Sequence, residues 1–248
     1  RDLVRSRGLG DVYKRQSFYK RTLSTTGFSA DYQGTGYSIN SRTAFQYLSD
    51  HQGIDQDFSP RSIYFARQDM KQKMFSEELN IKSTTPGRYK WLFGAFGFWQ
   101  GIDNTVTLDY FTKDYATRKL YDTPAYGVAF YHQSTIDDLL TRGLSLTFGI
   151  RYDYEHTSND FLFYKETDGG SEQMDAFDSR LKFSQVTPKI ALQYMFPSTG
   201  MLYATVTKGY KTGGFNTSFD REEDRTFRPE TSWNYELGAK HPLSLIHI

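Results

Sequence analysis

The sequence predicts an all-β fold, a partial antiparallel transmembrane β-barrel with about nine strands. Two observations carry this prediction. Apolar and polar residues alternate along most extended segments, and the connections alternate between tight turns and long polar stretches. Membrane-spanning barrels have this pattern because one side of each strand faces lipid, and because short turns gather at one rim and long loops at the other.

The alternation is clearest in the eleven residues from Leu144 to Tyr154, LSLTFGIRYDY. Every second residue is apolar or aromatic, and the residues between them are small, polar or charged. Successive side chains on a strand point to opposite faces, so this segment has one apolar face and one wet face. At roughly 3.3 Å per residue and a tilt near 45°, it covers about 25 Å, the height of the apolar band of such a barrel.

In the first half of the chain, four segments have the length and pattern of strands. Two turn signals join them in pairs, QGTG at 33–36 and TPGR at 85–88. Long polar stretches at 49–68 and 101–122 are expected to be loops, the second with a short strand at 106–110. The expected strands are 23–32, 37–48, 70–84 and 89–100. In the last of these, apolar residues occupy both odd and even positions.

The second half repeats this arrangement. PSTG at 197–200 is a turn, and a brief connection at 142–143 joins two strands. The stretches 157–180 and 212–229 are expected to be long loops. The expected strands are 126–136, 144–155, 181–196, 202–211 and 231–240.

Composition agrees with this fold and excludes several functions. Seventeen per cent of the residues are aromatic, yet the mean hydropathy is −0.65, as expected where strands show apolar groups on one face only. The sequence contains no run of about 18 apolar residues, so it predicts no transmembrane helix. The chain has no cysteine, which excludes disulfides, thiolate catalysis and cysteine-based zinc sites. Its 30 basic and 29 acidic residues nearly cancel, and no basic stripe points to nucleic acid.

The two ends of the sequence share a non-protein origin in our interpretation. Residues 243–248, LSLIHI, can be encoded by DNA whose reverse complement encodes DVYKRQ, the residues at 11–16. One short DNA element therefore explains both ends, and it resembles a transposon-end adapter used in sequencing libraries. We expect 1–16 and 243–248 to be non-native and 17–242 to be barrel.

Specific blocks resemble the barrel of TonB-dependent outer-membrane receptors. The most distinctive are GYKTGGFN at 209–216 and PETSWNYELGAK at 229–240. Shorter pieces occur in the family's order, and the resemblance covers nearly all of residues 17–242. These pieces are FSEELNIKS at 75–83, YKWLFGAFGF at 89–98, GIRYDYEH at 149–156 and TPKIALQY at 187–194.

The resemblance implies a barrel of about 22 strands closed around an N-terminal plug, of which this chain would supply no plug and about nine strands. It implies import of a scarce ligand such as a ferric siderophore across the outer membrane of a Gram-negative bacterium. The implied partners are outer-membrane lipid, the TonB energy-transducing complex acting through the plug, and the ligand. No cofactor, nucleic acid or enzymatic reaction is expected.

Two alternatives stay open at this point. A passive porin-like outer-membrane channel would have a similar wall without a plug. A secreted β-sandwich binding module would also have alternating strands, but its apolar faces would be buried beneath a second sheet.

Polar residues on the wet faces are the candidate site, and no catalytic, cofactor-binding or metal site is predicted. Arg151, Asp153 and Glu155 project from one face of the clearest strand. They could line the solute path, hold the plug, or simply hydrate the lumen wall. The remaining candidate lumen-facing residues are Lys189, Gln193, Asn234, Glu236 and Lys240.

The stretch 157–180 carries both aromatic and acidic residues. Phe161, Phe163 and Tyr164 could stack on a ligand or pack the loop together. The six carboxylates of this stretch could bind calcium, but their spacing is not that of an EF-hand, and this favours a solvated loop.

Overall fold

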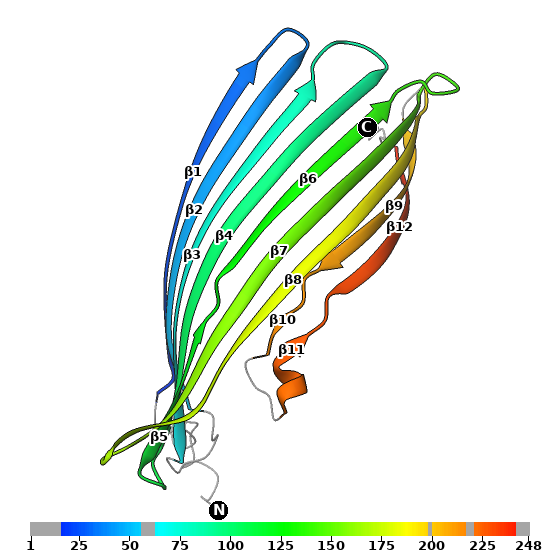
Figure 1. Ribbon diagram of the computed structural model, residues 1–248. Coiled ribbons are helices and arrows are strands. Elements are labelled where there is room, and N and C mark those ends of the chain that lie inside the picture. Colours follow the sequence, from blue (N-terminus) through cyan, green and yellow to red (C-terminus); the bar gives the residue numbers. More distant parts are fainter. Residues whose placement is uncertain (1–15, 56–62, 198–199, 217–220, 242–248) are drawn as a thin grey trace, which may run out of the picture.

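The structure is a computed structural model that describes residues 16–55, 63–197, 200–216 and 221–241. Within these residues, ten strands form one long, curved antiparallel sheet (Figure 1). Two short strands, β10 (Gly214–Phe215) and β11 (Thr226–Phe227), pair separately, close in sequence to the 3-10 helix η2 (Glu222–Arg225). The strands of the large sheet are β1 (Phe18–Gln33), β2 (Tyr37–Ile54), β3 (Tyr64–Ser83), β4 (Tyr89–Tyr110), β5 (Tyr115–Asp122), β6 (Ala125–Ile136), β7 (Leu144–Thr167), β8 (Gly170–Met195), β9 (Met201–Lys211) and β12 (Glu230–Lys240).

β5 and β6 are two parts of one strand position, between β4 and β7. The pairs Asp103–Asp122 and Gln100–Ala125 keep one continuous register along β4. Pro124 lies between the two parts and has no N–H to donate to the ladder. The described residues therefore contain nine strand positions side by side, which confirms the predicted number.

Two of the predicted loops are wrong, because strands continue through them. Residues 101–122 form the end of β4, a tight turn and β5, while 157–180 form the ends of β7 and β8. At about 3.3 Å per residue, the 26 residues of β8 reach roughly 85 Å, which exceeds what a hydrocarbon core of about 30 Å requires. In the parts beyond the membrane both faces touch water, so the alternation that identifies a spanning strand is lost there.

The other two predicted loops are described only in part. β2 runs to Ile54 and β3 begins at Tyr64, so strands occupy 49–54 and 64–68 of the loop expected at 49–68, and residues 56–62 lie outside the described residues. The loop expected at 212–229 contains β10, η2 and β11. The ends interpreted as non-native lie outside the described residues except for Gln16, and that interpretation stays a prediction.

The turns after β4 and β7, at the lower rim in Figure 1, are short. Four further short connections lie at the upper rim. They join β1 to β2, β3 to β4, β6 to β7 and β8 to β9. In the β6–β7 connection, Asp138 and Gly143 have φ angles of 52° and 89°, and Asp138 Oδ1 accepts a 2.6 Å hydrogen bond from the Gly143 N–H. Lys90 Nζ on β4 donates to Asp137 Oδ2 at 2.6 Å, which ties this turn to the next strand.

The two faces of the sheet differ as the alternation predicts. Opposed residues on antiparallel strands point to the same side, and the pairs Phe148–Ile190 and Ile150–Pro188 continue the apolar face from β7 to β8. Phe148 and Ile150 are 44% and 41% exposed, so no second layer of the described chain covers them. The described residues therefore do not form a β-sandwich. No helix among them is long and apolar enough to cross a membrane.

We expect Ile150→Arg to lower the free energy of unfolding of the intact barrel by about 2–4 kcal/mol, because the arginine would enter hydrocarbon. Gln193→Arg, on the opposite face, is the matched control and should change the free energy by less than about 0.5 kcal/mol. Urea titration of the barrel refolded into lipid vesicles measures both. Equal losses would contradict the assignment of the faces.

Candidate functional site

The eight residues predicted to face the lumen lie on the charged face of the sheet. On β8, Lys189 is opposite Gly149 and Gln193 is opposite Ser145, which places both on the side of β7 that carries Arg151. On β12 the three predicted residues share this side through their partners on β9: Asn234 with Thr207, Glu236 with Thr205 and Lys240 with Met201. The structure gathers only Arg151, Asp153 and Glu155 into a cluster and spreads the others along the wall. A role in the solute path stays a prediction for all eight.

A cavity of about 350 Å³ lies against Arg151, Asp153 and Glu155. β9 stops pairing with β8 at Thr207, and the residues at its end, 210–212, line the cavity from the other side. The charged face is therefore the concave one, and the cluster lies where the chain folds over it.

Arg151 is held by one carboxylate and two aromatic rings. Its Nε donates to the two Asp153 carboxylate oxygens at 2.9 and 3.0 Å. Its guanidinium carbon lies 5.3 Å from the Tyr131 ring centroid and 5.9 Å from that of Phe96, distances at which a cation is attracted to an aromatic face. The rings come from β6 and β4, so one cation links three strand positions. Its side chain is still 38% exposed and can meet a solute.

Tyr131 is fixed from the neighbouring strands. Its hydroxyl lies 2.7 Å from both Glu78 Oε1 and Asn80 Oδ1 on β3, and its one proton can be donated to either. The ring crosses β4 at Gly94, where a Cβ would approach it to 2.1 Å. Glycine is therefore required at this position for Tyr131 to reach β3.

Sequence reasoning missed Tyr131, Phe96 and Glu78. The available signal was that residues 89–100 have apolar side chains at both odd and even positions. β4 is aromatic on both faces because Phe96 and Phe98 line the charged cavity, whereas Phe93 and Trp99 lie on the apolar side. A strand that breaks the alternation in this way indicates aromatic side chains on the wet face.

The aromatic residues predicted to contact a ligand have different surroundings. Phe161 is 3% exposed, between Tyr121 and Phe177, with ring centroids 5.0 and 4.7 Å away. It therefore packs the hairpin, which is the alternative that the sequence left open. Phe163 and Tyr164 are partly exposed, and ligand contact stays a prediction for them.

The acidic residues predicted in a loop lie instead on a hairpin. Among the described residues, no group of three or more histidine, aspartate or glutamate side chains could hold a metal ion. On the outward face, a row of aspartates crosses neighbouring strands through Asp103, Asp122, Asp160 and Asp178. Burial, and then the charges of Asp103 and Asp160, raise the pKa of Asp122 above its ordinary value.

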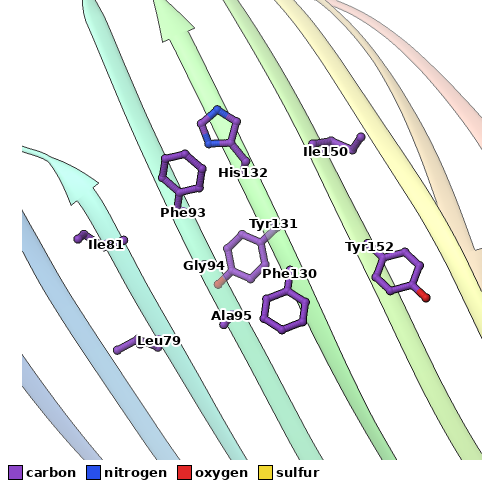
Figure 2. A pocket seen from close by; sticks show the side chains of 10 residues that line it. All are labelled: Leu79, Ile81, Phe93, Gly94, Ala95, Phe130, Tyr131, His132, Ile150 and Tyr152. Carbon is purple, nitrogen blue, oxygen red and sulfur yellow. The ribbon is translucent and has the colours of Figure 1, made fainter.

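A second depression lies on the apolar face between β3 and β7 (Figure 2). Its lining includes Leu79, Phe93, Phe130 and Ile150, which project from the face that the alternation assigns to lipid. Its walls offer hydrocarbon contacts and lack carboxylates and ammonium groups. It therefore belongs to the apolar surface and lies opposite the charged cluster.

We expect Gly94→Ala to cost about 1–3 kcal/mol of unfolding free energy, because the Tyr131 ring must leave its hydrogen bond to β3. In a Tyr131→Ala background the same substitution should cost almost nothing. Gly97→Ala is the control, since its Cβ would have no neighbour closer than 3.9 Å. A double-mutant cycle of unfolding measurements checks this, and additive costs would argue against it.

We expect Asp122→Asn to raise the melting temperature at pH 7 and to have little effect at pH 3. A carboxyl whose pKa is raised by folding binds its proton more tightly in the folded state. Stability therefore falls as the pH rises from the ordinary aspartate pKa, about 3.9, through the raised value. Circular dichroism melts of the barrel in detergent measure this, with Asp168→Asn in the hairpin turn as the control. An equal gain at both pH values would count against it.

Comparison with known proteins identifies the family. The family model described as TonB dependent receptor-like, beta-barrel matches residues 2–245. The ferric yersiniabactin uptake receptor FyuA from Yersinia pestis has a similar fold, with a TM-score of 0.76 at 20% identity over 92% of this chain and 34% of that chain. The siderophore receptor PiuA from Acinetobacter baumannii gives a TM-score of 0.70 at 14% identity over 92% and 39%. The ferric citrate transporter FecA gives 0.62 at 13% identity over 91% and 32%.

These solved structures are receptors and a transporter rather than enzymes, and at such identities the likeness shows the fold alone. The chain spans roughly a third of their length. The family model, in contrast, covers nearly all of the chain. The chain therefore belongs to the TonB-dependent receptor family and forms part of its outer-membrane β-barrel.

Proposed function

We propose that this chain is the barrel wall of a receptor that imports a ferric siderophore or a similarly scarce ligand. Energy would come from the TonB complex acting through a plug domain. The observation that carries the proposal is the concave, charged face of the sheet. The receptor-barrel family model matches the chain over residues 2–245. Such a wall can be lined by water, by a plug or by a hydrated solute, while the opposite face meets lipid.

The Arg151 cluster supports a binding role. Exposed ion pairs contribute little net stability, about 0–1 kcal/mol, so the partly exposed pair of Arg151 and Asp153 can exchange partners at small cost. The Tyr131 and Phe96 rings keep the guanidinium in place during such an exchange. We assign Arg151, Asp153 and Glu155 to contacts with a plug or a passing solute, and no covalent step to the barrel.

The ligand class is proposed from the relatives. FyuA takes up ferric yersiniabactin, PiuA is a siderophore receptor and FecA transports ferric citrate. All three names point to iron or to iron-carrying chelates. A passive porin-like channel is the second candidate, because the same wall would suit it, and an energy requirement separates the two.

We expect iron-starved cells that express the receptor to accumulate ⁵⁵Fe from at least one of three ferric chelates, a tris-catecholate, citrate or a hydroxamate. Disruption of the TonB protein should abolish this uptake, because the substrate must be moved by energy from the inner membrane. Cells without the receptor are the control. Uptake that persists without TonB would favour the passive channel.

A further inference from the structure

The ends of β4, β5 and β7 near the β4–β5 and β7–β8 turns carry opposite charges on their two faces. These ends lie at the lower rim in Figure 1, beyond the segments expected to span the membrane. On the concave face, Lys119 is directly opposite Phe163, and Tyr110 is directly opposite Tyr115, which neighbours Lys165. We call these five residues the lysine wall.

The two cations of the lysine wall rest on aromatic rings and not on carboxylates. Lys119 Nζ lies 5.4 Å from the Phe163 ring centroid, and Lys165 Nζ lies 4.9 Å from that of Tyr115. Glu172 is directly opposite Lys165 on β8, yet Lys165 turns the other way, toward β5. A lysine on an aromatic face keeps its full charge available to a solute.

The acidic residues of the same strand ends point outward. Cross-strand pairing places Asp103, Asp109, Asp122, Asp160 and Glu166 on the side away from the lysine wall. Arginines of that outward side neutralise two of them, Arg67 with Asp109 at 2.9 Å and Arg118 with Glu166 at 2.9 Å. At this level every second residue of β4, β5 and β7 faces inward, and none of these inward residues within 104–110, 115–121 and 159–165 is an acid. The nearest acids facing inward are on β8. Glu172 is opposite Lys165, and Asp175 is opposite Phe163 and lies 3.9 Å from Arg225.

We infer that the lysine wall is a binding surface for an anionic ligand that carries aromatic rings, such as a ferric tris-catecholate. This inference rests on the proposed function and names the ligand chemistry of that receptor. Two ammonium groups attract the anion, and the rings of Tyr110, Tyr115 and Phe163 offer flat faces for stacking. The outward acids would repel an anion from the outside of the barrel, so the charge pattern favours approach along the concave face.

Binding to the intact receptor in detergent tests the inference, with three probes of different charge and shape. A ferric tris-catecholate is anionic and aromatic, ferric citrate is anionic without rings, and a cationic ferric hydroxamate has neither feature. We expect Lys119→Gln/Lys165→Gln to raise the Kd of the tris-catecholate about tenfold or more at low salt and to leave the hydroxamate within about twofold. The effect should shrink at high salt.

Three further variants separate charge from folding and from stacking. Lys119→Arg/Lys165→Arg keeps both charges and should keep the affinity. Lys71→Gln/Lys73→Gln makes the same charge change on the outward face of β3 and should leave it unchanged. Tyr115→Leu/Phe163→Leu should weaken the tris-catecholate more than ferric citrate, because only the former can stack.

Several outcomes would overturn the inference. If Lys119→Gln/Lys165→Gln and Lys71→Gln/Lys73→Gln lost equal affinity for the tris-catecholate, the effect would be one of overall charge and the inference would fail. An unchanged Kd in Lys119→Gln/Lys165→Gln would also contradict it. A wild-type receptor that binds the cationic hydroxamate best would refute it and leave the proposed uptake intact. A wild type that binds none of the three ferric chelates would refute the proposed function, and this inference with it.

Discussion

Every backbone hydrogen bond of a membrane-spanning sheet must be made to a neighbouring strand, because hydrocarbon offers no alternative partner. This constraint sets the architecture of the chain. Neighbouring strands pair from β1 to β9 and on to β12, with a register shift between β7 and β8 at Phe163 and Tyr164. The break at Pro124 keeps the ladders of β4 and β7 in phase. A fixed register in turn fixes which side chains share a face, so that the strands together produce one apolar and one charged surface.

The two surfaces meet different demands along the same strands. Across the spanning part, the outward residues such as Phe148 and Ile150 are apolar, and the inward cluster of Arg151 and Asp153 is charged. Beyond it, both faces are wet, and the difference between them becomes one of charge sign. Acids gather outward in the row through Asp122, and the lysines turn inward onto aromatic rings. Both differences between the faces arise because successive side chains on a strand point to opposite sides.

Alternation predicted the nine strand positions, since lipid on one side imposes a visible pattern. It failed where that cause is absent. The hairpin ends of β4, β5, β7 and β8 resembled loops because water on both sides removes the pattern. Phe161 shows the same limit, because only the paired hairpin reveals that Tyr121 and Phe177 enclose it. Tyr131 was missed because its role depends on Gly94, a residue of another strand.

The sequence by itself determined the fold class, the tight turns and the orientation of those strands that alternate clearly, because these follow from local spacing and from which solvent each face meets. Only the tertiary structure decided which charged residues come together. Arg151 reaches rings from two other strand positions, and Lys165 turns toward Tyr115 and away from Glu172. Such choices depend on the register between strands and on the side chains opposite, which no single segment contains.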